Sequence, residues 1–215
     1  MHKLTRILLL GLVAASSVQA ATVTVSLKDA SGKPLSDTVV YLQAASPAAL
    51  PAAAEIQVEQ KDKEFRPFVS VVPVGTTAYF PNHDGIGHHV YSFSQAKTFE
   101  LPLSEAESSM SVLLDQPGIV TVGCNIHDWM VGYIQVVNTP YHGVSDNAGQ
   151  LAIGNVPAGN YTLFAWHPGI KSGMALEQAL TVNESASVQQ DLALDIKPEY
   201  FWKPPRPAEA DEEQY

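Results

Sequence analysis

The sequence predicts an all-β protein that consists of a β-sandwich and a second, smaller β-sandwich. Short runs rich in Val, Ile, Thr and aromatic residues recur along the chain, and clusters of Pro, Gly, Asp and Asn separate them. Many short strands at such spacing are typical of antiparallel sandwiches and barrels. The apolar content, 46% of the 215 residues, is sufficient for a buried core.

The first predicted strands lie in the N-terminal part of the chain. Val23, Val25 and Leu27 alternate with polar residues, which is the period-two pattern of a half-buried strand. A turn-forming stretch leads to a second predicted strand at 39–42. The alanine-rich stretch 45–54 contains two prolines that would interrupt a helix, so we expect a linker there.

Two further groups of strand signals follow the linker. The first group predicts strands at 56–58, 68–72, 77–80, 90–93, 110–114, 119–122 and 133–137. The second predicts strands at 151–153, 161–166, 179–182 and 188–194. The last stretch, 198–215, combines prolines with acidic residues and cannot bury apolar area, so we expect a disordered acidic tail.

The chain begins with the features of a secretory signal peptide. Lys3 and Arg6 precede a short apolar run over 7–15, and small residues lead to Ala20. The run is too short for a membrane-spanning helix, and no later stretch is long and apolar enough for one. We therefore expect the signal peptide, 1–20, to be cleaved after Ala20 and the protein to be periplasmic; a retained N-terminal anchor is the alternative.

The chain is acidic, and its charge limits the classes of partner. The formal net charge is −10, and loss of Lys3 and Arg6 with the signal peptide changes it to −12. An acidic surface disfavours nucleic acid, which requires Lys and Arg at its phosphates. It suits a protein partner with a basic patch, because complementary potentials speed encounter. No nucleophile–base pair or carboxylate pair has catalytic spacing, so the sequence does not predict an enzyme.

Cys124, the single cysteine of the chain, is the centre of the candidate site. It cannot form an internal disulfide, so in an exported protein it is buried, paired between chains or bound to a metal. His127 and Met130 follow at intervals of three, and the adjacent His88 and His89 stand upstream. A thiolate, two imidazoles and a weak thioether are the ligands of blue copper sites. Consecutive strand residues point to opposite faces, so only one histidine of the doublet can face such a metal.

Zinc and purely structural roles are the alternatives for these side chains. Zinc seldom takes a thioether and prefers a closed tetrahedral site, so it fits the pattern less well. Cys124 and Met130 could instead fill a core, and His127 could lie on the surface.

Residues 56–137 resemble a cupredoxin, a small blue copper protein of the plastocyanin and amicyanin kind. Asn82–Val90 looks like the segment that carries the first ligand histidine, and Cys-x-x-His-x-x-Met is the short form of the family's second ligand loop. The resemblance implies a Greek-key sandwich with one type 1 copper. Counting from Asn82 favours His88 over His89 as a ligand, and the implied ligand set is His88, Cys124, His127 and Met130.

The resemblance also implies supporting roles around the metal. Asn82 would tie the two ligand loops together, and the ring edge of His127 would reach the surface as the electron port, with Trp129 in its apolar rim. His89 stands where the family has an Asn that braces the cysteine loop, so the sequence lacks this brace. Asp128 and Trp129 also replace the Pro and Phe of the amicyanin loop.

Residues 21–44 and 139–197 resemble the two parts of a carboxypeptidase-regulatory-like (transthyretin-like) sandwich. An Asp-x-x-Gly turn ending at Gly149 and a Pro-x-Gly-x-Tyr turn ending at Tyr161 carry this resemblance. The cupredoxin-like segment, 55–138, interrupts the order of strands. We therefore expect it to be inserted into a surface loop of an accessory domain, because insertion is tolerated where host ends lie close together. One continuous larger sandwich is the alternative.

These features predict a periplasmic type 1 copper protein that carries single electrons between redox partners, such as a c-type cytochrome or a dehydrogenase. One alternative is a copper carrier or storage protein that delivers its metal. The other is a β-sandwich interaction module without a metal. Copper loading distinguishes the three.

Overall fold

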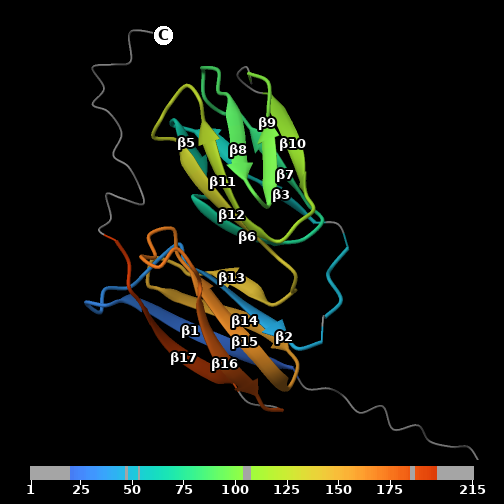
Figure 1. Ribbon diagram of the computed structural model, residues 1–215, viewed down its shortest axis with the longest axis vertical. Helices are drawn as coiled ribbons and strands as arrows, with labels where there is room; N and C mark the ends of the chain where they lie inside the picture. The colour runs from blue at the N-terminus through green and yellow to red at the C-terminus, as the bar shows by residue number, and fades with distance from the viewer. Residues whose placement is uncertain (1–19, 47, 53, 104–107, 185–186, 198–215) are drawn as a thin grey trace, which may run out of the picture.

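The computed structural model describes residues 20–197, except 47, 53, 104–107 and 185–186 (Figure 1). The predicted acidic tail and the predicted signal peptide, apart from Ala20, therefore lie outside the described residues. Every named element of the described chain is a β-strand, which confirms the all-β class. The described part of the chain contains no helix with the length and hydropathy that a membrane crossing requires.

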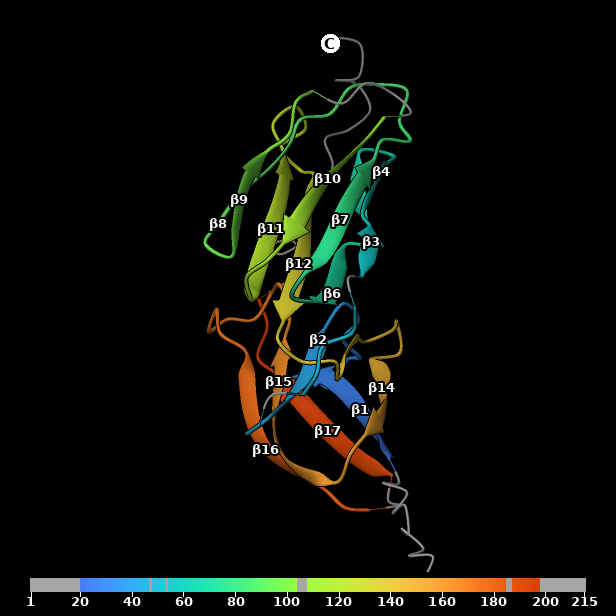
Figure 2. The ribbon, with the colours of Figure 1, turned by 90° about the vertical axis from the view of Figure 1, so that its right-hand side faces the viewer.

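The strands form two β-sandwiches, stacked along the long axis of the molecule (Figures 1 and 2). The strands of the first, here the site sandwich, are β3 (Glu55–Gln57), β4 (Glu59–Lys61), β5 (Glu64–Arg66), β6 (Val69–Pro73), β7 (Thr76–Pro81), β8 (Val90–Ser94), β9 (Lys97–Glu100), β10 (Ser109–Leu114), β11 (Gly118–Cys124) and β12 (Val131–Val137). A five-stranded sheet, β6-β12-β11-β8-β9, faces a three-stranded sheet, β10-β7-β3, and β4 and β5 form a separate hairpin.

The second, here the flanking sandwich, is built from both ends of the described chain. Its strands are β1 (Ala21–Asp29), β2 (Val39–Ala44), β13 (His142–Val144), β14 (Gln150–Val156), β15 (Gly159–Trp166), β16 (Leu176–Val182) and β17 (Val188–Leu194). They form the sheets β14-β1-β17 and β13-β2-β15-β16. Strand β1 pairs antiparallel with β14 and parallel with β17, so the first strand of the chain lies between two of the last.

Each sandwich has its own apolar core. In β1, the alternating Val23, Val25 and Leu27 are fully buried, as their period predicted. Strand β6 serves both cores, because Val69 belongs to the flanking core and Val72 to the site core. The sandwiches are in apolar contact through this region, and aromatic rings add to the contact: Tyr133 of β12 and Trp166 of β15 lie edge-on, with centroids 5.6 Å apart.

All of the predicted strands are present, but the sequence did not predict β4, β5, β9 or β13. Strands β4 and β5 consist mainly of charged and polar residues, β9 is a short edge strand, and β13 has three residues. The turn between β4 and β5 is formed by Asp62 and Lys63, both at positive φ (54° and 55°), without the Asn-Gly pair that usually marks such a turn.

The order of β11 and β12 places the candidate site. β11 ends at Cys124, and β12 returns from Val131 to Val137, after which the chain enters the flanking sandwich. The loop between them therefore lies at the end of the site sandwich that is farther from the flanking sandwich. The arrowhead of β11 points toward this end in Figures 1 and 2.

Candidate metal centre

Three of the predicted ligand side chains meet at this end of the site sandwich. Sγ of Cys124 lies 3.7 Å from Nδ1 of His88 and 3.9 Å from Nδ1 of His127. The three ligand atoms all lie within 4.8 Å of one another, as a metal site requires. The exposed fractions of Cys124, His88 and His127 are 3%, 0% and 6%, so the cluster is buried.

Backbone pairing holds the two loops that carry these side chains. Val90 and Cys124 are partners in the β8–β11 ladder, which places the segment before β8 beside the end of β11. The N–H of Met130 donates to the carbonyl of His127 at 2.9 Å, and the N–H of Cys124 donates to the carbonyl of Met130 at 3.3 Å. These bonds close the loop. Met130 is 2% exposed and packs in the same core as Cys124; its role as a fourth ligand stays a prediction.

The structure brings His88 to Cys124 and turns His89 elsewhere. Nε2 of His89 lies 3.3 Å from Oε1 of Glu100, and the His89 side chain is 21% exposed. This alternation is the one expected for neighbouring residues at the start of a strand. The main chain of His89 nevertheless joins the loops, because its carbonyl accepts the N–H of Asn125 at 3.0 Å. This backbone bond links the two loops at the position at which the sequence has His89 in place of the expected Asn.

Asp84 is a residue of the candidate site that the sequence did not predict. Its Oδ2 lies 2.8 Å from Nε2 of His88, and its carboxylate also accepts the N–H groups of Asp62 and Lys63, at 2.6 and 2.9 Å. An ionised carboxylate can only accept, so Nε2 of His88 carries a proton, and the other ring nitrogen, Nδ1, faces Cys124. Carboxylates commonly orient metal-binding histidines in this way. An acidic residue four positions before His88 was the available signal.

Asn82 shapes the turn that carries Asp84. Its Nδ2 donates to the carbonyl of Ile86 at 2.9 Å, and its Oδ1 accepts the N–H of Asp84 at 3.0 Å. Asn82 is 1% exposed, so its side-chain amide lies inside the turn. The predicted tie from Asn82 to the cysteine loop stays a prediction. His83, the next residue, is exposed.

Trp129 covers one side of His127. The two rings lie edge-on, with centroids 5.2 Å apart, and Trp129 itself is half-buried. Within the described residues, Nε1 of Trp129 is buried without a hydrogen-bond partner. The electron port at His127 and its apolar rim at Trp129 both stay predictions.

The surroundings shift the protonation of the three side chains. Burial raises the pKa of the Cys124 thiol, but hydrogen bonding from His88 and from backbone N–H groups outweighs burial and holds that pKa below 9.0. Burial lowers the pKa of His88, yet Cys124 and Asp84 together raise it above 6.5. Burial, with the charges of His88 and Lys63, lowers the pKa of His127. The cluster thus favours a thiolate, the form of cysteine that binds metals.

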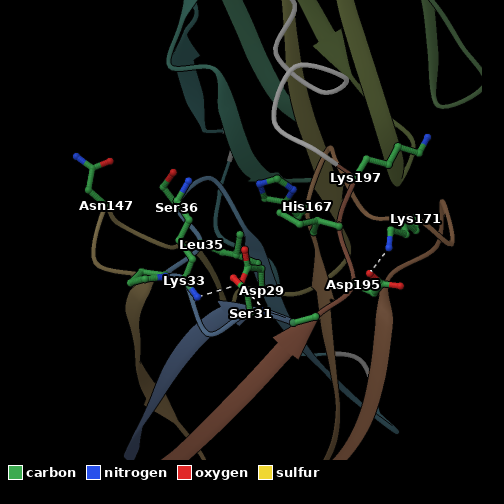
Figure 3. Close-up of a pocket in the computed structure, with 13 residues that line it drawn as sticks. Asp29, Ser31, Lys33, Leu35, Ser36, Asn147, His167, Lys171, Asp195 and Lys197 are labelled. Atoms are coloured by element: carbon green, nitrogen blue, oxygen red, sulfur yellow. Dashed lines mark hydrogen bonds and ion pairs between the residues drawn. The ribbon is translucent and has the colours of Figure 1, made fainter.

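A separate pocket of about 540 Å³ lies in the flanking sandwich (Figure 3). Its lining includes Asp29, Lys33, His167, Lys171, Asp195 and Lys197, and none of the three clustered donors. Both carboxylates are already engaged: Asp29 accepts the N–H groups of Ser31 and Lys33, and Asp195 pairs with Nζ of Lys171 at 2.7 Å.

The chain is similar to copper proteins of known structure over part of its length. No protein-family model matches it, and no curated protein does. A reduced variant of amicyanin is 21% identical over 46% of this chain and 98% of its own, with a TM-score of 0.37. A purple cupredoxin from Nitrosopumilus maritimus is 23% identical over 39% of this chain and 99% of its own, with a TM-score of 0.34. A Cu-containing nitrite reductase from Thermus scotoductus SA-01 is 25% identical over 43% of this chain, with a TM-score of 0.37, and the match spans 25% of the reductase chain.

Proposed function

We propose that the protein is a type 1 copper protein that carries single electrons between redox partners. The observation that carries the proposal is the buried cluster of one sulfur and two nitrogen atoms from Cys124, His88 and His127. A thiolate and two imidazoles suit copper. Bonds of about 2.0–2.3 Å to a first-row metal allow two ligand atoms to lie up to about 4 Å apart. The separations of 3.7 and 3.9 Å therefore fit a shared ion.

The residues divide the work of the site. Cys124, His88 and His127 would hold the ion, and Met130 would be its weak axial ligand. Bound copper supplies a centre that accepts and releases one electron. Asp84 keeps the far nitrogen of His88 protonated, and the closed loop holds Cys124 and His127 at a fixed spacing. Ligands that are held in this way move little when the charge of the metal changes, which favours fast electron exchange.

Burial favours electron transfer over copper delivery. His88 is fully buried and Cys124 is 3% exposed, so a chelator or acceptor cannot reach either ligand atom without opening the loops. His127 is 6% exposed, and we propose its ring edge as the electron port, with Trp129 in its rim. Met130 in the same core favours copper over zinc, which seldom binds a thioether.

We also propose the domain division and the cellular setting. Residues 55–138 would be a cupredoxin domain inserted between 21–44 and 139–197, with the linker at 45–54. The strand pairing supports this, because every strand of the flanking sandwich comes from those two outer segments. We propose that the flanking sandwich is of the transthyretin-like kind, that the chain is exported to the periplasm, and that it meets a c-type cytochrome or a dehydrogenase through a basic patch on that partner. The charge of −10 supports such a partner.

Loading the purified protein with one equivalent of Cu(II) tests the proposal. We expect an intense visible thiolate-to-copper band, which Cys124→Ser abolishes. His88→Ala should abolish the band and the matched His89→Ala should retain it. Reversible one-electron oxidation and reduction without loss of metal would support an electron carrier. Copper that binds without the band and passes readily to a chelator would instead indicate a copper carrier, and absence of binding would indicate an interaction module.

A further inference from the structure

We infer that the tight turn Asp62–Lys63, between β4 and β5, is a positioning element that fixes which ring nitrogen of His88 faces Cys124. The inference rests on the proposed metal-binding function of the cluster. The turn lies 21 or more residues before the carboxylate that it contacts, and none of its side chains belongs to the predicted ligand set.

The backbone of the turn presents two donors side by side that the hairpin ladder does not use. In a two-residue hairpin turn, the ladder does not use the N–H groups of the two central residues. Asp62 and Lys63 occupy these positions, since Lys61 and Glu64 are the last paired residues of the hairpin. Their φ angles of 54° and 55° aim both N–H groups at Asp84, one at each carboxylate oxygen.

The carboxylate passes this orientation to His88. The N–H of Asp62 donates to Oδ1 and the N–H of Lys63 donates to Oδ2, so a bond at each oxygen restrains rotation of the Asp84 carboxylate. Its Oδ2 therefore accepts Nε2–H of His88 from a fixed direction, at 2.8 Å. The opposite nitrogen, Nδ1, then lies 3.7 Å from Sγ of Cys124. Charge-assisted hydrogen bonds are stronger and more directional than neutral ones, so this arrangement selects one tautomer.

Independent contacts fasten the hairpin to the site. Gln60 of β4 is fully buried, and its side-chain Nε2 donates to the backbone carbonyl of Phe80 at 3.0 Å. The backbone carbonyl of Gln60 accepts the N–H of His83 at 2.8 Å. Phe65 of β5 is 2% exposed and lies against Gly132 of β12, where an added Cβ would stand 3.0 Å from Cβ of Phe65. The turn is thus held against the site without the help of Asp84.

The test compares turn variants of the metal-free protein by ¹⁵N NMR of the histidine rings, at a pH at which the imidazole is neutral. Asp62→Val with Lys63→Val disfavours positive φ, whereas the matched control, Asp62→Asn with Lys63→Gly, favours it. We expect wild type and control to hold His88 as the Nε2–H tautomer. In the valine variant the turn should no longer orient the Asp84 carboxylate, so the hydrogen bond from Nε2 of His88 should weaken and the other tautomer should rise about tenfold or more. A folded valine variant that keeps the single tautomer would overturn the inference.

A second measurement covers a valine variant that does not fold. In the wild type, the N–H groups of Asp62 and Lys63 should exchange with solvent at least about tenfold more slowly than in Asp84→Ala. Equal exchange in the two proteins would refute the inference equally. Both measurements are made without metal, so their outcome is separate from that of copper loading: a protein that binds no copper can still show the predicted tautomer.

Discussion

Asp84→Asn changes the chemistry of the site with almost no change in side-chain size. Three donors converge on the carboxylate: the N–H groups of Asp62 and Lys63, at 2.6 and 2.9 Å, and Nε2 of His88, at 2.8 Å. The two oxygens of a carboxylate accept all three. Asn offers one oxygen and an NH₂ group that itself donates, so at least one of the three donors must face another donor.

The cost follows mainly from the burial of one of these donors, Nε2 of His88. A hydrogen bond to a charged group contributes about 1.5–3 kcal/mol, and water cannot replace the partner of a fully buried ring nitrogen. His88 is 0% exposed, so the upper half of that range applies. We expect Asp84→Asn to lower the free energy of unfolding by about 2–3 kcal/mol at pH 7, which is a change of about 30- to 150-fold in the folding equilibrium.

The effect should depend on pH with a definite sign. Burial raises the pKa of Asp84, but hydrogen bonds from Lys63, His88 and Asp62 outweigh it and hold the pKa below 3.8. A carboxyl group with a lowered pKa contributes stability that is complete above its unfolded pKa and is lost as the pH falls through its folded pKa. Because Asn does not titrate, the difference between the two proteins should be full at pH 7 and should shrink as the pH falls below 3.8.

Urea unfolding of the metal-free proteins, followed by tryptophan fluorescence and circular dichroism, measures this difference. Asp115→Asn is the matched control, because Asp115 pairs with Lys97 at 2.9 Å with its side chain 52% exposed, and such surface pairs contribute little to stability. A loss for Asp84→Asn no larger than that of the control would refute the reasoning, as would a loss that is the same at pH 3 and pH 7.

Three further predictions concern the rest of the molecule. Gly149→Ala should lower the free energy of unfolding by about 3 kcal/mol or more in a urea titration, because φ is +71° and the added Cβ would clash with the carbonyl oxygen of Leu27. The control is Gly32→Ala, at φ +90°, where an added Cβ meets nothing within 4 Å and the loss should be about 1 kcal/mol. Burial lowers the pKa of His167 from 6.5 to about 4, so the free energy of unfolding should be highest above pH 6.5 and fall by about 3 kcal/mol toward pH 4. His167→Asn should flatten this pH dependence in a series of melting temperatures. Trp129→Phe removes a buried N–H that has no hydrogen-bond partner in the described part of the chain, and it keeps a ring against His127. The free energy of unfolding should therefore stay within about 1 kcal/mol or rise, and a loss above about 2 kcal/mol would contradict this.

The sequence predicted the strands because strand patterns are local. Val23, Val25 and Leu27 show which face of β1 is buried without reference to any other part of the chain. The same local alternation separated His88 from His89, and the structure has only His88 beside Cys124.

The supports of the site were not predictable, because they depend on long-range backbone contacts. The hairpin β4–β5 has no apolar period, and its turn reaches Asp84 only after the chain has folded. The carbonyl of His89, which joins the loops through Asn125, is a backbone group that any residue would supply. Residue identity carries little information about such contacts, so the sequence could predict the three side chains that cluster but not the contacts that support them.

The pairing of β1 with β17 has a consequence for the order in which the molecule folds. All strands of the site sandwich precede residue 138 in the chain, whereas β1 can complete its pairing only with β17, Val188–Leu194. Once the site sandwich has folded, it holds the two ends of the stretch 45–141 close together. The entropy cost of closing this loop, which opposes the pairing of His142 in β13 with Tyr41 in β2, is then smaller. Substitutions that slow the folding of the site sandwich should therefore also delay the flanking sandwich, although they touch none of its residues.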